Sequence, residues 1–429
     1  MQFSHSPATL AARVRVQLVR RNLRPPKLAI LRRFFETLYF ASLRTDEGRP
    51  VRVDVVYIDS SNPDPSPPEV LRQDRWSYVR LATPLPFSIQ NLVKIALASD
   101  PRSSAIAVDV DRRSQLRIWG VLDQQNQFSD FLNYDSDEGP SRPGLFQTSI
   151  LGLGNIAVYL DYQKLLELRV NEIVGPAIDV FGSPGPIQSL IGSAAVSSIA
   201  GRETELPEID DAWLYWYWSG TLSRILLRAN GFRHGGAFLL TATDDPTDLK
   251  INYPISYDRL RPALERRLLL ARSVETARDR VDRLPHSSPT VPRDDYLTEL
   301  IGSQDIRNSK AEVDGVVWFI SLLSRVDGCV WLTHDLHVRG FGVEITAATE
   351  PAAVYLAKNA SASGPRLRQV EYRLFGTRHR SMMRYIAKHP RSLGIVVSQD
   401  GSIRFLHKFR RKLVMWDNVR LQLHVPSRR

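Results

Sequence analysis

Short apolar runs alternate with amphipathic helical stretches along most of the chain, and this alternation restricts the possible folds more than any other feature. Residues 51–58 (VRVDVVYI) alternate between apolar and polar side chains, as a half-buried strand does. Similar runs predict strands at 77–82, 105–110, 115–121 and 155–160, and helical spacing predicts helices at 88–98 and 162–173. Strands interleaved with helices are typical of the α/β class. We therefore expect a mixed α/β region in the N-terminal part.

The middle of the chain combines helical patterns with two segments typical of connectors. Residues 181–207 are rich in Gly, Ser, Ala and Pro, which predicts a long loop. Helices are expected from Trp213 to about Asn230, where aromatic residues are concentrated, and at 257–284. The aromatic cluster is most simply explained as core or domain interface, and a base-stacking platform is the alternative. The Pro- and Ser-rich segment 285–294 predicts a linker.

These signals predict two α/β domains. We place an N-terminal α/β region at 1–284, with the helix 257–284 as its connector, and a second domain at 295–429 after the linker 285–294. The second domain is expected to be a mixed β-sheet flanked by helices. Its predicted elements are a helix at 310–325, strands at 329–332, 336–345, 393–398 and 402–407, and a helix at 381–389. Residues 219–240 and 318–332 share one plan, a helix followed by a glycine-containing break and an apolar strand.

The charge balance favours an anionic partner. The chain of 429 residues has 57 Lys and Arg against 46 Asp and Glu, a formal net charge of +11, which suits a nucleotide, a nucleic acid or an acidic lipid. The single cysteine, Cys329, excludes a disulfide framework and a cysteine-rich zinc site. No apolar run approaches the roughly 18–20 residues of a membrane span, and we see no signal peptide. We expect a cytoplasmic protein without a membrane partner.

A cationic turn begins the predicted helix 381–389. Gly376, Thr377, Arg378, His379 and Arg380 stand in sequence immediately before it. A helix N-terminus presents unpaired N–H groups and a partial positive charge. Two guanidinium groups there form a bidentate clamp for oxyanions, and the threonine adds a hydroxyl donor. The turn therefore predicts a phosphate-binding site, although such a motif alone is often only a solvated basic turn.

A carboxylate stands at the junction between the predicted helix 310–325 and the next strand. Asp327 is followed by Gly328, whose backbone can approach a ligand closely. A carboxylate in this setting can hold Mg²⁺ or Mn²⁺ beside a ribose hydroxyl. Asp-Gly is also a common turn, and Asp314-Gly315 repeats it nearby. The order and placement of both motifs together are more informative than either motif alone.

Together these motifs resemble the diadenylate cyclase (DAC) domain. Members of that family carry Asp-Gly-Ala at a helix-to-strand junction, then Gly-Thr-Arg-His-Arg at the start of a helix, and then a strand that ends in Val-Ser. The matching residues here are Asp327-Gly328-Cys329, Gly376-Thr377-Arg378-His379-Arg380 and Val396-Val397-Ser398-Gln399. The resemblance covers 295–415. The chain departs from the family pattern at Cys329, at Gln399-Asp400 and in the longer segment 346–370.

The resemblance implies an enzyme that condenses two ATP molecules into cyclic di-AMP with Mg²⁺ or Mn²⁺. Two domains would meet face to face, in a homodimer or a higher oligomer. Asp327 would ligate the metal ion beside the ribose 3′-hydroxyl. Thr377, Arg378, His379 and Arg380 would bind the phosphates, with Gly376 and Ser398 nearby, and Gly328 and Cys329 would line the nucleotide pocket through their backbone.

Residues 30–260 are similar to the N-terminal region that precedes some DAC domains, the probable sensor domain DACNV. The segments that carry this similarity include LRRFFETLYFASLRTDEGRP, NLVKIALASD and RIWGVLDQQ. Two other functions stay open. The first is a nucleotide-binding sensor without catalytic activity. The second is a nucleic-acid-binding protein that uses the basic N-terminal 33 residues and the aromatic cluster.

Overall fold

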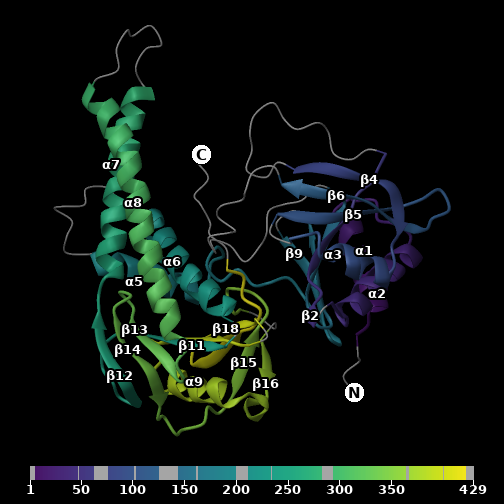
Figure 1. The fold of residues 1–429 in the computed structure, drawn as a ribbon. Coiled ribbons are helices and arrows are strands. Elements are labelled where there is room, and N and C mark those ends of the chain that lie inside the picture. Colours follow the sequence, from purple (N-terminus) through teal and green to yellow (C-terminus); the bar gives the residue numbers. More distant parts are fainter. Residues whose placement is uncertain are drawn as a thin grey trace. The chain divides into compact units, whose positions relative to one another are not determined.

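The structure is a computed structural model that describes most of the chain. The chain divides into two compact units. The described residues are 5–46, 48–61, 76–100, 103–124, 144–160, 163–199, 211–232, 234–282, 293–363, 367–399 and 401–421. The first unit is Met1–Ala177 and the second is Ile178–Arg429. Both are mixed α/β, as the sequence predicts (Figure 1).

The first unit is an eight-stranded sheet with helices on one face. Its helices are α1 (Pro7–Arg20), α2 (Leu28–Ser42) and α3 (Ile89–Ala96). The short strands β1 (Thr45–Asp46) and β2 (Arg49–Pro50) pair with each other. The sheet contains β3 (Val53–Tyr57), β4 (Trp76–Pro86), β5 (Ser104–Val110), β6 (Leu116–Gln124), β7 (Phe146–Gly152), β8 (Asn155–Leu160), β9 (Gln163–Arg169) and β10 (Glu172–Val174). Their order is β10-β9-β8-β7-β3-β5-β6-β4, and the described neighbours are antiparallel except β3 and β5.

Helical spacing accounts for the core of the first unit. Leu10, Val14 and Leu18 recur every four residues along α1 and are fully buried. Phe34 and Phe35 of α2 lie in the same apolar cluster as alternate strand residues, and each buried ring contributes about 1.5–3 kcal/mol through removal of apolar surface from water.

The second unit is a nine-stranded sheet with helices on both faces. Its helices are α5 (Pro186–Ile199), α6 (Asp211–Gly231), α7 (Leu260–Asp282), α8 (Arg293–Leu323), the 3-10 helix η2 (Tyr372–Leu374) and α9 (Thr377–Lys388). The strands are β11 (Gly236–Thr241), β12 (Leu249–Tyr257), β13 (Cys329–Thr333), β14 (Val338–Ile345), β15 (Val354–Ala357), β16 (Arg368–Val370), β17 (Leu393–Val397), β18 (Ile403–Phe409) and β19 (Lys412–Trp416). Their order is β12-β14-β13-β11-β17-β18-β19-β15-β16.

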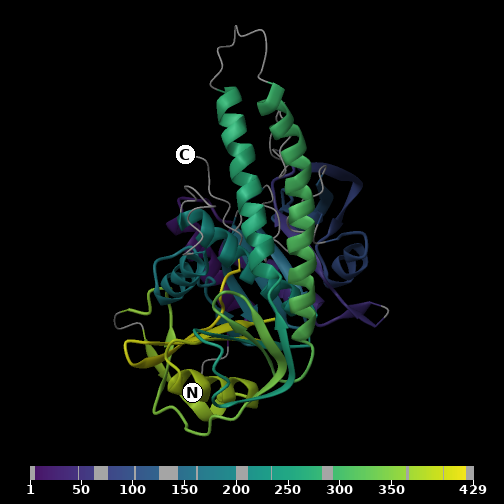
Figure 2. The same ribbon diagram turned by 90° about the vertical axis from the view of Figure 1, so that its left-hand side faces the viewer.

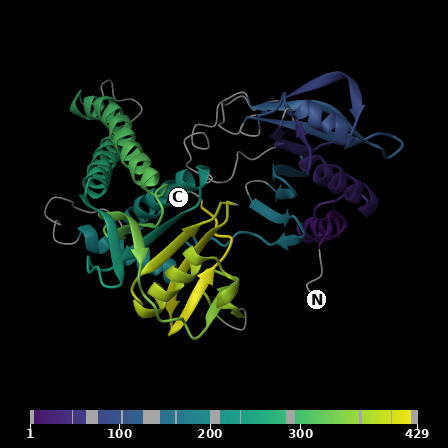
Figure 3. The same cartoon turned by 60° about the horizontal axis from the view of Figure 1, so that its bottom comes forward.

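Alternating strand residues divide the second unit into two cores. Phe238 and Leu240 of β11 belong to the cluster formed with α5, α6, α7 and α8. Ala237 and Leu239 of the same strand belong to the cluster formed with α9. The sheet is therefore the middle of three layers, and Figure 3 shows its C-terminal strands, in yellow, side by side. Helices α7 and α8 continue beyond the sheet as a projecting pair (Figures 1 and 2).

The two segments with a shared plan lie next to each other in the second unit. Helix α6 leads into β11 and helix α8 leads into β13, and these two strands are parallel neighbours, with Phe238 opposite Val330. Most predicted elements of this unit are confirmed, including α9 and the hairpin of β17 and β18. Part of the aromatic cluster is core, because Trp218 is fully buried and Tyr215 nearly so, and the partly buried Trp216 and Tyr217 pack against that core.

Two sequence predictions are wrong. Residues 163–169 form strand β9 rather than a helix, because Leu166 and Leu168 pair in register with Val158 and Ile156 of β8. Cross-strand pairing outweighs the helix preference of this segment. Residues 186–199 form helix α5 rather than a loop, with Ile187, Ile191 and Ala195 buried at four-residue intervals. Their small neighbours obscured the periodicity.

The division between the units differs from the predicted domain boundary. Strand β11 pairs with both β13 and β17, so residues 236–241 belong to the same sheet as the C-terminal strands. The predicted N-terminal region 1–284 therefore contributes α5, α6, α7, β11 and β12 to the second unit. Of the predicted linker 285–294, residues 285–292 lie outside the described residues.

Candidate functional site

Several chain segments that are distant in sequence end at one edge of the second unit's sheet. Strands β11 and β13 are parallel, and β17 runs antiparallel to β11. The starts of β11 and β13 therefore lie beside the end of β17 and the start of β18, where Val397 pairs with Ile403. Asp327, Gly235 and Ser398 flank these strand ends, and the sheet topology alone brings them together.

Asp327 and Arg378 meet at this edge. Oδ1 of Asp327 lies 4.0 Å from Nη2 of Arg378, and the two side chains are 96% and 35% exposed. A pair this open to water contributes little to stability. Its geometry leaves the carboxylate and the guanidinium accessible to a ligand at the same place.

Gly328 shapes the turn that places Asp327 just before β13. Its φ of +110° is a conformation that favours glycine, and a Cβ there would lie 2.6 Å from the carbonyl carbon of Gly342. The backbone of β14 therefore passes directly against this turn. Any larger residue would displace the strand that positions Asp327.

The N-terminus of α9 provides the cationic side of the site. Gly376 is the N-cap without a side-chain hydrogen bond, and the N–H of Arg380 donates to its carbonyl at 3.0 Å. The first N–H groups of a helix have no intrahelical acceptor, and they favour an anion together with the helix dipole. Thr377 is exposed, and the buried Nε of Arg380 has no hydrogen-bond partner among the described residues.

The backbone conformation at position 376 does not require a glycine. Its φ is −62°, and nothing lies within 4 Å of the position of a Cβ. A tight turn therefore does not explain this glycine, and the open space leaves room for a ligand close to the backbone.

Cys329 contributes no side chain to the edge. Its thiol is 4% exposed and packs in the core beneath α9, and burial raises its pKa to about 12. Only its backbone lies close to the turn at Gly328. The backbone role in a nucleotide pocket that the sequence resemblance implies for Cys329 stays a prediction.

Sequence reasoning missed Arg404, which connects two of the predicted site residues. Its Nη1 lies 3.1 Å from Nε2 of His379 and 3.1 Å from Oγ of Ser398, and its Nε lies 3.0 Å from Oδ1 of Asp417. Arg404 stands between Ile403 and Phe405, which face the core formed with α5 to α8, and it lies on the α9 side of the sheet, as Leu406 does. A lone cation on a buried strand was the signal that could have revealed it.

The donor set suits a metal ion that a nucleotide brings with it. Within the described part of the chain, no group of three or more His, Cys, Asp or Glu side chains gathers in a metal-binding arrangement. Mg²⁺ is usually held by one or two carboxylates together with substrate phosphates and water. The exposed carboxylate of Asp327 beside a phosphate-binding helix start fits that mode.

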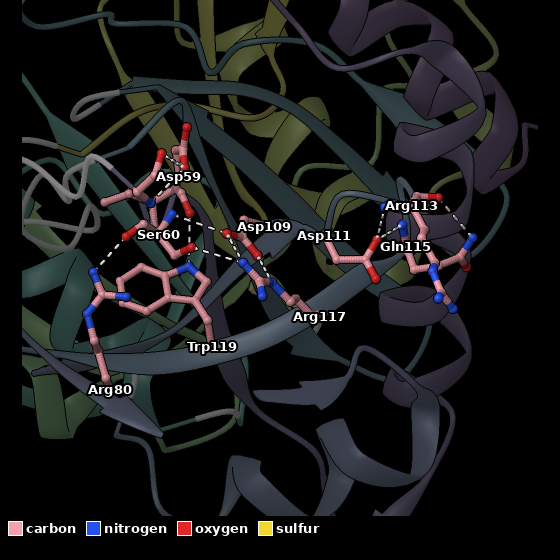
Figure 4. A network of polar contacts seen from close by, with 11 residues as sticks. Asp59, Ser60, Arg80, Asp109, Asp111, Arg113, Gln115, Arg117 and Trp119 are labelled. Carbon is pink, nitrogen blue, oxygen red and sulfur yellow. Dashed lines mark hydrogen bonds and ion pairs between the residues drawn. The ribbon is translucent and has the colours of Figure 1, made fainter. Parts of the chain in front are cut away.

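The first unit carries a polar network at the ends of its parallel strands (Figure 4). Asp109, near the end of β5, accepts from Nε of Arg117 at 2.7 Å and from the N–H of Ser60 at 3.1 Å. Arg80 donates to the carbonyl of Ser60 at 2.6 Å and lies over the ring of Trp119. This network ties the segment after β3 to three other strands.

Residues 21–123 match the family model of the probable sensor domain DACNV. The match includes the residues of the Figure 4 network and ends at β6, inside the first unit. It confirms the sensor part of the predicted resemblance, over a shorter range than the 30–260 inferred from the sequence. No curated protein matches the chain. In the described residues, no helix is long and apolar enough to cross a membrane.

Proposed function

We propose that the second unit is a nucleotidyltransferase of the diadenylate cyclase type, controlled by the N-terminal DACNV region. It would condense two ATP molecules into cyclic di-AMP or a related cyclic dinucleotide. The observation that supports this most strongly is the approach of Asp327 to Arg378 at the start of α9, from segments far apart in the chain. A carboxylate for a divalent ion and a clamp for phosphates are the two parts that phosphoryl transfer needs in one place.

The cationic helix start would bind the triphosphate. Arg378 and Arg380 offer guanidinium donors, Thr377 a hydroxyl and α9 its first N–H groups. His379 and Ser398 lie beside them, held by Arg404. Catalysis by such a site is mainly positioning and charge neutralisation, because the protein forms no covalent bond to the nucleotide.

Asp327 would hold Mg²⁺ or Mn²⁺, which neutralises charge on the phosphates and makes the ribose 3′-hydroxyl easier to deprotonate. In each half-reaction a bond forms between the 3′-oxygen and the α-phosphorus of the other ATP. The bond from that phosphorus to the β-phosphate bridging oxygen breaks, pyrophosphate leaves, and the hydroxyl proton passes to solvent. Two such steps give one cyclic product and two pyrophosphates. They require two sites face to face, hence a homodimer or higher oligomer.

The test is a product assay on the full chain. Purified protein with ATP and Mn²⁺ is expected to form a cyclic dinucleotide, identified by mass spectrometry. Asp327→Asn should abolish the product while the circular dichroism spectrum is preserved. Asp305→Asn, which removes the same charge on the projecting helix α8, should keep the activity. A folded oligomer that forms no product from any nucleoside triphosphate would contradict the proposal.

A nucleotide-binding sensor without turnover is the second candidate. Asp417, another carboxylate close to this edge, is engaged by Arg404, so Asp327 would hold a metal ion with few other protein ligands. Tight ATP binding without any product would select this function. The nucleic-acid-binding alternative loses Trp218 and Tyr215 as stacking residues, because both are buried in the core.

A further inference from the structure

We propose that Arg404 is a positioning residue that fixes His379 as a neutral ring with its proton on Nδ1 and holds Ser398 beside it. The consequence for turnover rests on the proposed function, whereas the state of the ring does not. The contacts that support it are those from Nη1 of Arg404 to Nε2 of His379 and to Oγ of Ser398, both 3.1 Å.

The chemistry of the guanidinium decides the direction of these hydrogen bonds. Arginine carries only donors and stays protonated at any accessible pH. The nitrogen of His379 that faces Arg404 must therefore accept, so Nε2 carries no proton. The proton of the neutral ring is then on Nδ1, because the hydrogen bond at one nitrogen determines the tautomer. A doubly protonated ring would place donor against donor and cation against cation at this distance.

The guanidinium is itself held in place. Its side chain is 18% exposed, and Nε lies 3.0 Å from Oδ1 of Asp417, which follows β19. Asp417 thus pairs with the guanidinium by charge, without a hydrogen bond to Nε, while Nη1 reaches His379 and Ser398. Packing between β18 and α9 leaves Arg404 few other orientations, which makes its contacts a preorganised unit.

The surrounding charges also disfavour a positive ring. His379 stands between Arg378 and Arg380 on α9 and faces Arg404 from β18. Among the described carboxylates at this edge, Asp327 lies 4.0 Å from Arg378 and Asp417 pairs with Arg404. The three guanidinium groups around His379 oppose a further positive charge on its ring.

Arg404 acts on the site through its neighbours. It joins the end of β17, where Ser398 lies, to the first turn of α9, where His379 lies. A lysine cannot replace it, because a single ammonium group cannot span Asp417, Ser398 and His379 in the fork geometry of arginine. The predicted role of Arg404 is thus to hold the end of β17 and the start of α9 in a fixed relative position.

The test measures the imidazole tautomer of His379 in the full chain without nucleotide. Two-bond ¹H–¹⁵N correlations on protein labelled at histidine nitrogen distinguish the tautomers, and the His379 signals are assigned by their loss in His379→Gln. We expect the Nδ1–H tautomer in the wild type and a shift towards a mixture of tautomers in Arg404→Met. An Nε2–H tautomer in the wild type, or identical His379 signals in both proteins, would overturn the proposal.

Kinetics with ATP and Mn²⁺ add a second readout. Arg404→Lys and Arg404→Met should lower kcat by about tenfold to a hundredfold with a smaller change in KM. The reason is that His379 and Ser398 would move out of their positions beside the phosphates, and misplaced groups slow the reaction. Should Arg404→Met not fold, Arg404→Lys carries the spectroscopic test. If His379 shows the predicted tautomer but the protein has no turnover, the cyclase proposal is refuted and the inference about the His379 ring stands. If the enzyme is active and its kinetics are unchanged in the Arg404 variants, the proposed effect of Arg404 on turnover is refuted.

Discussion

Nη1 of Arg378 lies 2.9 Å from the position that a Cβ would occupy at Gly235. Gly235 precedes β11 with a φ of +75°, and the guanidinium occupies the space that its missing side chain leaves. The glycine between α6 and β11 thus makes room for Arg378, which is part of the proposed phosphate clamp at the start of α9. A glycine outside both recognised motifs is part of the candidate site.

Gly235→Ala should therefore weaken nucleotide binding. The new methyl group displaces the end of Arg378, and the positive φ adds strain of about 1 kcal/mol or more. Titration calorimetry with ATP and Mg²⁺ should show a reduced affinity. Gly315→Ala is the control, because no atom beyond the adjoining residues and the helix's own backbone lies within 4 Å of the position of a Cβ at this helical residue, and alanine favours a helix. Equal affinities in both variants would contradict the role of Gly235.

Gly328→Ala and Gly376→Ala should differ sharply in stability. At 328 the Cβ would lie 2.6 Å from the backbone of Gly342 at a φ of +110°, whereas at 376 it meets nothing within 4 Å. We expect Gly328→Ala to lose about 2 kcal/mol or more, and Gly376→Ala no more than about 1 kcal/mol. Urea unfolding midpoints measure both. Similar losses at the two positions would show that the turn at Gly328 is not as described.

Glu167 should make the first unit sensitive to acid. Burial alone would raise its pKa, but Lys164 and Arg169 outweigh burial and hold the pKa at about 2. Because the folded pKa is lowered, the stabilisation is present at neutral pH and is lost as the pH falls from about 4.5 to about 2.

Glu167→Gln should cost the first unit about 3 kcal/mol at neutral pH, since it leaves Lys164 and Arg169 beside an uncharged side chain. Hydrogen exchange at pH 7 should accelerate in peptides from β8 and β9, while peptides from β11 and β13 serve as an internal control. The difference in unfolding midpoint between variant and wild type should shrink at about pH 3. A difference that persists unchanged there would contradict the ion-pair explanation.

Cys329 should react with thiol reagents only when the second unit opens. It is the single cysteine of the chain, so one mass shift reports the reaction. Burial raises its pKa to about 12 from an ordinary value of 9.0, so the native thiol is neutral and stability should fall as the pH rises above about 9. Iodoacetamide labelling at pH 8 should be slow in the native chain and fast in urea. Rapid native labelling would contradict the burial of Cys329 beneath α9.

Much of the fold follows from local sequence signals. Helical patterns revealed α3, α6 and α7, and apolar runs revealed β3, β5 and β17. The signals failed where long-range pairing decided the outcome, as at residues 163–169, and where small residues hid the buried stripe of α5. The unit boundary was missed because no local pattern shows that β11 inserts between β13 and β17.

The candidate site was partly visible in the sequence. Asp327 and the run from Gly376 to Arg380 were found from their order and residue types. Their convergence needed the strand order, and Arg404, Asp417 and Gly235 lie in segments without a motif. Their roles depend on which strand ends share an edge, which sequence spacing does not encode.

The most direct test of the account is a crystal structure of the full chain with Mn²⁺ and an ATP analogue that lacks the 3′-hydroxyl. The account predicts the phosphates at the start of α9, in contact with Arg378 and Arg380, and the metal ion between them and Asp327. A nucleotide bound elsewhere, with Asp327 and Arg378 both remote from its phosphates, would contradict it.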